Sequence, residues 1–171
     1  KVIVVQLGDK QVEELAYAFA DRHTIVIASP AYQGSAMARA MRQFWLGVTA
    51  ALQDPKTQWV MSLEEETVLG KDALRFTSAM FERYSGVTSF RGVNLGSLET
   101  GANLAGTYSL LRYGFHGAGG ALPRHVWRLA RVLAGTRRRR HDAFDGQVEN
   151  FLKTGFMVTP NLSRYVNFGW I

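Results

Sequence analysis

The sequence predicts one α/β domain with a mixed, mostly parallel sheet and helices on both faces. Strand-like and helix-like segments alternate over residues 2–63, which is typical of parallel strands joined by crossover helices. The length of 171 residues, with 47% hydrophobic and 20% charged residues, suits a single globular core. No apolar run reaches the roughly 18 residues that a membrane-spanning helix needs, so no such helix is expected.

The first half contains five segments with a clear hydrophobic period. Short runs rich in β-branched residues indicate strands, and apolar residues three and four positions apart indicate helices. Ser35 is a suitable N-cap residue for the second helix, which ends before Asp54-Pro55. The expected elements are a strand at 2–7, a helix at 11–21, a strand at 23–29, a helix from 35 to about 52 and a strand at 59–63.

The second half is less regular, because the segment 94–120 is rich in glycine and small residues. We expect short strands within 108–115 and a mobile loop at 117–120. Pro123 suits the first turn of a helix, and Gly155 suits the position just after one. The other expected elements are helices at 72–84, 123 to about 134 and 145–153, and strands at 87–93 and 156–159.

Three consecutive acids, Glu64, Glu65 and Glu66, follow the strand at 59–63. Negative charge concentrated at one point costs free energy unless a positive group, such as a divalent cation, lies beside it. The carboxyl end of a strand is also where open α/β sheets bind their ligands. The alternative is a solvated strand-to-helix turn, in which the acids lie near a helix N-terminus that tolerates them.

The net charge of +6 has a local source in the second half. This arginine cluster consists of Arg124, Arg128, Arg131 and the run 137–140. Such a cluster could bind phosphates, nucleic acid or an anionic membrane surface, or it could be a solvated helix end. Interleaved aromatic residues and a recognisable module are missing, so we expect no nucleic acid. Because the chain has no cysteine, disulfides and thiolate metal sites are excluded.

Four separated passages share their order and residue types with one known family. One contains the acid run, one lies in the turn and helix before it, one is rich in glycine, and one closes the chain. The passages are 33–40; 63–68 with 71–76; 114–124 with Trp127; and Phe144-Asp145 with 153–155, 160–163 and 167–170.

In this combination the chain resembles the GT-A glycosyltransferases, most closely the bacterial family-two-like group and more distantly the N-acetylglucosaminyltransferases. The resemblance covers most of the chain and implies a GT-A-like, Rossmann-like fold. It implies an enzyme that transfers a sugar from a nucleotide-sugar donor to a glycan or lipid-linked acceptor. The implied reaction depends on Mn²⁺ or Mg²⁺, which neutralises the departing diphosphate, and inverts the anomeric centre.

The resemblance also assigns roles to particular acids. Glu66 matches the metal-ligating position, and Glu64 and Glu65 shape the donor site around it. Asp145 matches the general base that deprotonates the acceptor hydroxyl, with Asp142 as its nearest rival. The alternative for Asp145 is an N-cap of the helix that follows it.

Further candidates for substrate binding lie in loops and at element ends. Asp9, at the end of the first strand, could contact the nucleotide or could be a plain turn residue. His116 and Gly117 lie in the glycine-rich passage on the acceptor side, and a lone histidine is more often structural than functional. The remaining candidates are Gln33, in the passage before the acid run, and Arg124.

The chain departs from the family in three respects. All three acids are glutamates where the family's metal motif ends in aspartate. The glycine-rich passage lacks the family's tryptophans, and the first segment of the chain resembles the family's second strand. We therefore expect a domain that spans 1–171 and belongs to a longer chain.

Two other functions stay open. One is a degenerate, non-catalytic GT-A domain that binds a glycan or a partner protein. The other is a basic module that binds nucleic acid or a membrane surface through the arginine cluster. The expected location is cytoplasmic, and the arginine cluster would allow contact with the inner face of the membrane.

Overall fold

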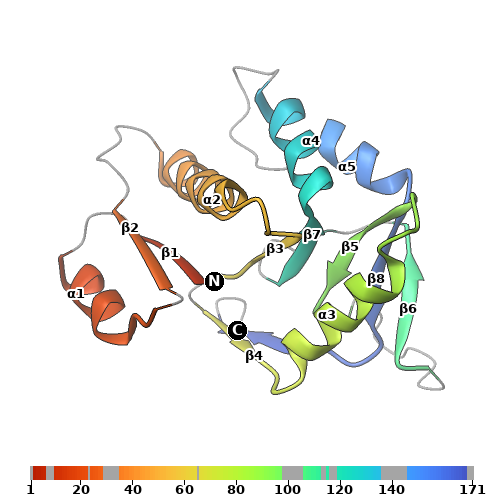
Figure 1. Ribbon diagram of the computed structural model, residues 1–171, viewed down its shortest axis with the longest axis horizontal. Coiled ribbons are helices and arrows are strands. Elements are labelled where there is room, and N and C mark those ends of the chain that lie inside the picture. Colours follow the sequence, from red (N-terminus) through yellow and green to blue (C-terminus); the bar gives the residue numbers. More distant parts are fainter. Residues whose placement is uncertain are drawn as a thin grey trace. The chain divides into compact units, whose positions relative to one another are not determined.

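The computed structural model describes residues 2–6, 10–22, 24–28, 35–64, 66–97, 106–112, 115, 119–135 and 146–168 (Figure 1). The chain divides into two compact units. Unit 1 contains Lys1–Gln58 and Gly135–Ala143, and unit 2 contains Trp59–Ala134 and Phe144–Ile171. The expectation that 1–171 acts as a single domain stays a prediction.

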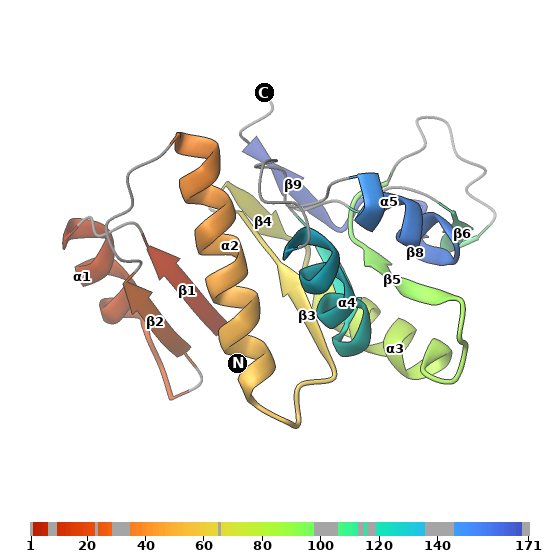
Figure 2. The ribbon, with the colours of Figure 1, turned by 90° about the horizontal axis from the view of Figure 1, so that it is seen from above.

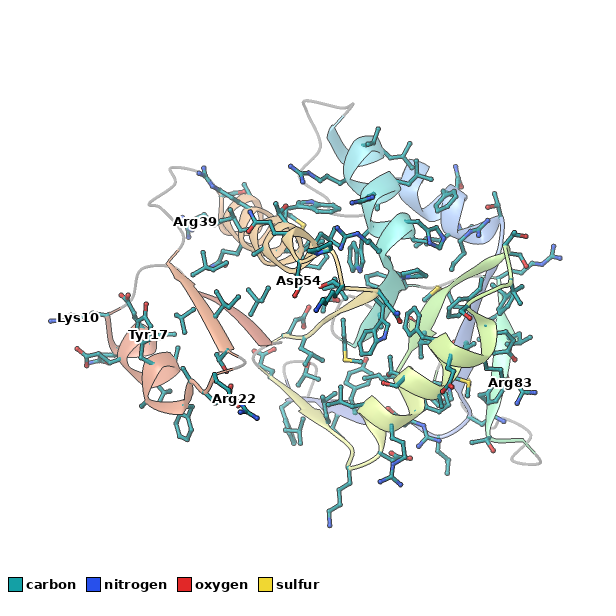
Figure 3. The ribbon with its side chains drawn as sticks, in the orientation of Figure 1. Lys10, Tyr17, Arg22, Arg39, Asp54 and Arg83 are labelled. Atoms are coloured by element: carbon teal, nitrogen blue, oxygen red, sulfur yellow. The ribbon has the colours of Figure 1, made fainter. Side chains whose placement is uncertain are left out.

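The described residues of unit 1 form two parallel strands and two helices. They are β1 (Val2–Gln6), α1 (Lys10–Phe19), β2 (Thr24–Ala28) and α2 (Ala36–Gln53). The two strands pair in parallel, with Val2 opposite Thr24, as the strand–helix–strand pattern predicts. The predicted N-cap of α2 is confirmed, because the Ser35 hydroxyl accepts a hydrogen bond from the Ala38 N–H at 3.2 Å. On α1, the side chain of Tyr17 is 58% exposed (Figure 3).

Unit 2 is built on a five-stranded mixed sheet. Its strands lie in the order β3-β7-β5-β8-β6. The β5–β8 pair is parallel, and the other three pairs are antiparallel. The strands are β3 (Trp59–Ser62), β7 (Gly120–Pro123), β5 (Phe90–Asn94), β8 (Phe156–Pro160) and β6 (Tyr108–Leu111). A separate antiparallel pair consists of β4 (Thr67–Leu69) and β9 (Tyr165–Asn167).

The prediction of an α/β fold with a mixed sheet is confirmed, but the prediction of a mostly parallel sheet is wrong for unit 2. The difference comes from β7, whose first residue falls in the segment that was expected to be a mobile loop. β7 lies between β3 and β5 and runs antiparallel to both. Glycine and alanine have low strand propensity, but all four β7 residues are buried. Burial at the centre of the sheet, rather than local propensity, therefore determines this strand.

Helix α3 (Ala73–Tyr84) lies across β5 and β8 (Figure 1). Phe81 of this helix stacks on Trp59 of β3, with the ring centroids 5.1 Å apart and the planes 8° apart. Arg83, in the last turn, extends into solvent (Figure 3). The buried cluster on this face contains Ala73, Phe76, Met80, Phe81, Phe90, Val93, Leu95, Ala121 and Val158.

Helices α4 (Arg124–Gly135) and α5 (Gly146–Lys153) lie near one another and apart from α3 (Figure 1). Figure 2 shows α4 and α5 as neighbours in the second view. Because strand side chains alternate between the two faces, Leu122 and Met157 face away from the α3 cluster. Trp127 of α4 is completely buried, and its indole N–H donates a hydrogen bond to the Val60 carbonyl at 2.9 Å. The sheet of unit 2 is therefore flanked by helices, as predicted.

Gly92 allows the three central strands of this sheet to pack closely. Its φ of +153° is a backbone conformation that other residues rarely adopt, and the β5–β8 register shifts between Phe90 and Gly92. A Cβ at this position would lie 2.3 Å from the Ala121 carbonyl oxygen. The bulge therefore requires glycine.

Candidate functional site

The acid run forms the turn between β3 and β4. β3 ends at Ser62, and the Thr67 N–H donates to the Glu64 carbonyl at 3.0 Å. Glu64 and Glu66 are both exposed, whereas Glu65 lies outside the described residues. The acids thus follow a strand end, as predicted, but the next element is another strand and not a helix. The alternative of acids at a helix N-terminus therefore does not hold for this turn, which we call the acid turn (64–66).

The C-terminal strand β9 holds the acid turn in place. β9 pairs with β4 directly after the turn, with Leu69 opposite Tyr165. The Phe168 N–H donates to the Glu66 carbonyl at 3.1 Å, and the Gly70 N–H donates to the Arg164 carbonyl at 2.8 Å. These hydrogen bonds fix the backbone of the turn on both sides of β4, so the exposed glutamate side chains start from a defined position.

Three strands of the sheet end at the edge where the acid turn lies. β3, β5 and β8 run in the same direction, because β7 is antiparallel to both β3 and β5. Gly120 lies opposite both Ser62 and Asn94, so the ends of β3 and β5 are level with the start of β7. Ligands of open α/β sheets bind at such carboxyl edges. The predicted position of the site at a strand end is consistent with this arrangement.

The segments beyond these strand ends are joined by backbone hydrogen bonds. The Leu95 N–H donates to the Gly119 carbonyl at 2.8 Å, and the Arg164 N–H donates to the Leu95 carbonyl at 2.7 Å. The Arg164 guanidinium also forms an ion pair with Asp72 and lies 4.3 Å from the centroid of the Phe76 ring. The segments after β5 and before β9 are thereby held beside the first residues of β7.

Tyr165 is the aromatic residue at this edge that interacts electrostatically with the acid turn. Burial raises the pKa of its phenol, and the negative charge of Glu64 raises it further. The phenol is therefore neutral and can donate a hydrogen bond at physiological pH. Its ring contacts Gly96 and Gly119 and packs against the core cluster under α3.

The donor atoms of the acid turn fit a hard divalent cation. Carboxylate oxygens are the ligands that Mg²⁺ and Mn²⁺ prefer, and Mg²⁺ is often held by one or two carboxylates together with substrate phosphates. Within the described residues, no group of three or more His, Cys, Asp or Glu side chains could hold a metal ion. Of the described residues in the acid turn, Glu64 and Glu66 carry the carboxylates that could ligate such a cation.

Arg124 is not brought to the acid turn. It begins α4 directly after Pro123, which lies opposite Trp59 at the start of β3. The glutamates follow the other end of that strand, roughly 10 Å away along the ladder for three residues at about 3.3 Å each. Arg124 therefore lies at the edge of the sheet away from Glu64.

The other predicted site residues lie outside the part of the chain that the structure describes. Their roles as base, donor contact or acceptor contact stay predictions. They are Asp9, Gln33, Glu65, His116, Gly117, Asp142 and Asp145.

The described part of the arginine cluster lies on α4. Arg128 and Arg131 are exposed and three positions apart, so they share one side of the helix. The run 137–140 lies outside the described residues. None of the helices described here combines the length and the apolar character that crossing a membrane requires.

Sequence reasoning missed Tyr165, Gly96 and Gly119. These residues are far apart in the chain, and the contact of the ring with the two glycines becomes visible only in the fold. The glycine pair at 119–120 is a signal for Gly119, but it lacks a strand pattern and therefore predicts a loop. Comparison with models of protein families and with curated proteins found no match for this chain.

Proposed function

We propose that the protein is a metal-dependent glycosyltransferase, which moves a sugar from a nucleotide-sugar donor to a glycan or lipid-linked acceptor with inversion. The observation that carries the proposal is the exposed pair Glu64 and Glu66 at the carboxyl edge of three strands that run in one direction. The sequence resemblance to the GT-A glycosyltransferases supports it, because Glu66 matches the metal-ligating acid of that family.

Charge explains why a cation belongs in this proposal. A nucleotide diphosphate is an anion, and the two glutamates repel it unless a positive group lies between them. A bound Mn²⁺ or Mg²⁺ would neutralise the charge that builds on the departing diphosphate. The chain contributes the fixed backbone of the acid turn, held by the hydrogen bonds from Thr67 and Phe168.

Thermal unfolding in the presence of UDP-, GDP- and CMP-sugars, each with and without MnCl₂, tests the donor class. We expect one nucleotide series to stabilise the protein only when Mn²⁺ is present. A ligand at 100 times its dissociation constant adds about 2.7 kcal/mol to the free energy of unfolding, so the shift is easily measured. The same shift without Mn²⁺, or no shift with any nucleotide sugar, would contradict the proposal.

The predicted general base is tested separately from the metal ligand. Asp145→Asn should leave Mn²⁺-dependent donor binding nearly unchanged and reduce turnover by ~10²–10⁴-fold, the usual contribution of a general base. If Asp145→Asn instead unfolds the protein and has no separate effect on the rate, Asp145 is the N-cap of the helix that follows it. Donor binding without turnover in the wild-type protein would favour the non-catalytic, degenerate domain.

The exposed arginines of α4 favour a second candidate, a basic module for polyanions. Arg128 and Arg131 share one side of the helix with two exposed apolar residues, Leu129 and Val132, which are 37% and 62% exposed. Binding through such a surface weakens steeply as the salt concentration rises. Tight, salt-steep RNA binding without any nucleotide-sugar effect would favour this candidate over the glycosyltransferase.

A further inference from the structure

The Tyr165 ring occupies a position that two glycines leave open. A Cβ on Gly96 would lie 2.7 Å from Cε1 of this ring and 3.1 Å from its Oη. A Cβ on Gly119 would lie 3.2 Å from Cδ1 of the same ring. Any side chain at Gly96 would therefore displace the tyrosine, and one at Gly119 would crowd it.

The backbone on either side of the ring is also fixed. Tyr165 pairs with Leu69 in the β4–β9 ladder, and the preceding residue, Arg164, is hydrogen-bonded to Leu95 and to Gly70. The ring packs against the core cluster under α3, yet Tyr165 is only partly buried. The ring is thus held by packing on one side, and the negative charge of Glu64 in the acid turn acts on its phenol.

We propose that Tyr165 is a positioning residue of the acid-turn site and that its hydroxyl donates a hydrogen bond to a phosphate oxygen of a diphosphate bound beside Glu64. This inference rests on the proposed function. A phosphate next to two glutamates needs donors as well as a cation, and a neutral phenol supplies one without adding charge. The two glycines leave open the space that this ring fills.

Tyr165→Phe is the direct test, because it removes the hydroxyl and keeps the ring that fills the space beside the glycines. With UDP and GDP as probes and MnCl₂ present, titration calorimetry should show affinity weakened by about 12- to 160-fold for one lost hydrogen bond to a charged group. The melting temperature without ligand should change little. Tyr108→Phe is the matched control. Tyr108 lies on β6, and its hydroxyl is hydrogen-bonded to that of Tyr84 at 3.0 Å. Removing this hydroxyl should leave nucleotide affinity unchanged.

Gly96→Ala tests the seating of the ring without touching the hydroxyl. The added methyl should displace the ring from its present position and weaken nucleotide binding in the same direction as Tyr165→Phe. In the Tyr165→Phe background, Gly96→Ala should cause a smaller further loss than it does alone, because the hydroxyl that it displaces is already gone. If Gly96→Ala does not fold, the Tyr165→Phe titration decides the inference.

The outcomes separate this inference from the proposed function. Wild-type affinity for the nucleotide in both tyrosine variants would overturn the role of Tyr165 and leave the glycosyltransferase proposal standing. Equal weakening by Tyr108→Phe would overturn it too, because the effect would not be local to the acid turn. Failure of the wild-type protein to bind UDP or GDP with Mn²⁺ would overturn both.

Discussion

Gly155 is a residue where a single added carbon should be strongly destabilising. A Cβ at this position would lie 2.1 Å from the Ser89 carbonyl oxygen and 2.7 Å from Cγ of Arg91. The first of these atoms is backbone, so the strain cannot be relieved by a side-chain rotation. Gly155→Ala should lower the free energy of unfolding by about 1–3 kcal/mol, the usual cost of overpacking, as measured by urea denaturation.

Gly86 provides the matched control for that measurement. A Cβ there would meet no atom within 4 Å, and its φ is not positive. Gly86→Ala should change the free energy of unfolding by no more than about 0.5 kcal/mol in either direction. A Gly155→Ala protein as stable as Gly86→Ala would contradict the close approach of Gly155 to Ser89.

A pair of tyrosines should make the stability of unit 2 depend on pH in alkaline solution. The pKa of Tyr108 is raised above 10.0, first because its hydroxyl is hydrogen-bonded to that of Tyr84 and then because of burial. The folded protein therefore keeps a proton that the unfolded chain loses. Stability is unaffected below about pH 10 and falls as the pH rises above it, because the unfolded state then binds fewer protons.

Tyr108→Phe should reduce this alkaline loss. Guanidinium denaturation from about pH 8 to about pH 11 would show a shallower decline in the variant than in the wild type. Other groups titrate in this range in both proteins, so the difference between the two slopes is the quantity to compare. Identical slopes would mean that the Tyr84–Tyr108 hydrogen bond does not stabilise the folded state.

At the residue scale, the sequence predicted where Gly155 lies but not why glycine is required there. Gly155 was predicted after a helix because glycine tolerates a left-handed backbone there. Among the described residues, however, the one positive φ belongs to Gly92. Gly155 is required because Ser89 and Arg91 approach it closely, and such contacts between distant segments leave no local pattern in the sequence.

At the scale of elements, the N-cap of α2 gives the clearest test. The Ser35 hydroxyl accepts from the Ala38 N–H at 3.2 Å, which satisfies one of the free N–H groups at the helix start. Ser35→Ala should cost about 1 kcal/mol of stability, measured by circular dichroism during denaturation. Ser35→Asp keeps an acceptor oxygen at the cap and should retain most of that stability.

Every helix that the structure describes was predicted within a few residues, because each has an apolar face with the helical period. The strands were harder. β7 lacks strand propensity and exists because it is buried between β3 and β5, and β4 and β9 are three-residue strands whose pairing depends on the whole fold. For the site, the acid turn was predicted correctly at a strand end, but β9 and Tyr165 could not be placed beside it from the sequence.

For the whole molecule, the structure divides the chain into two compact units, whereas the sequence predicts one domain. If the chain is one cooperative domain, a substitution in either unit should shift the same unfolding transition. We expect Ser35→Ala in unit 1 and Gly155→Ala in unit 2 to shift the same single unfolding transition, as measured by calorimetry. Two separate transitions, with each variant moving only one, would mean that the units fold independently.

The central claim is that the acid turn binds a divalent cation together with a nucleotide diphosphate. The most direct measurement is titration calorimetry of UDP or GDP with MnCl₂ into the wild-type protein, Glu66→Gln and Glu82→Gln. Glu82 is exposed on α3 in the same unit, so its substitution removes the same charge away from the turn. A neutral amide oxygen is a weaker ligand for a hard cation. We predict that Glu66→Gln abolishes Mn²⁺-dependent nucleotide binding and that Glu82→Gln leaves it intact, whereas unchanged binding by Glu66→Gln would contradict the claim.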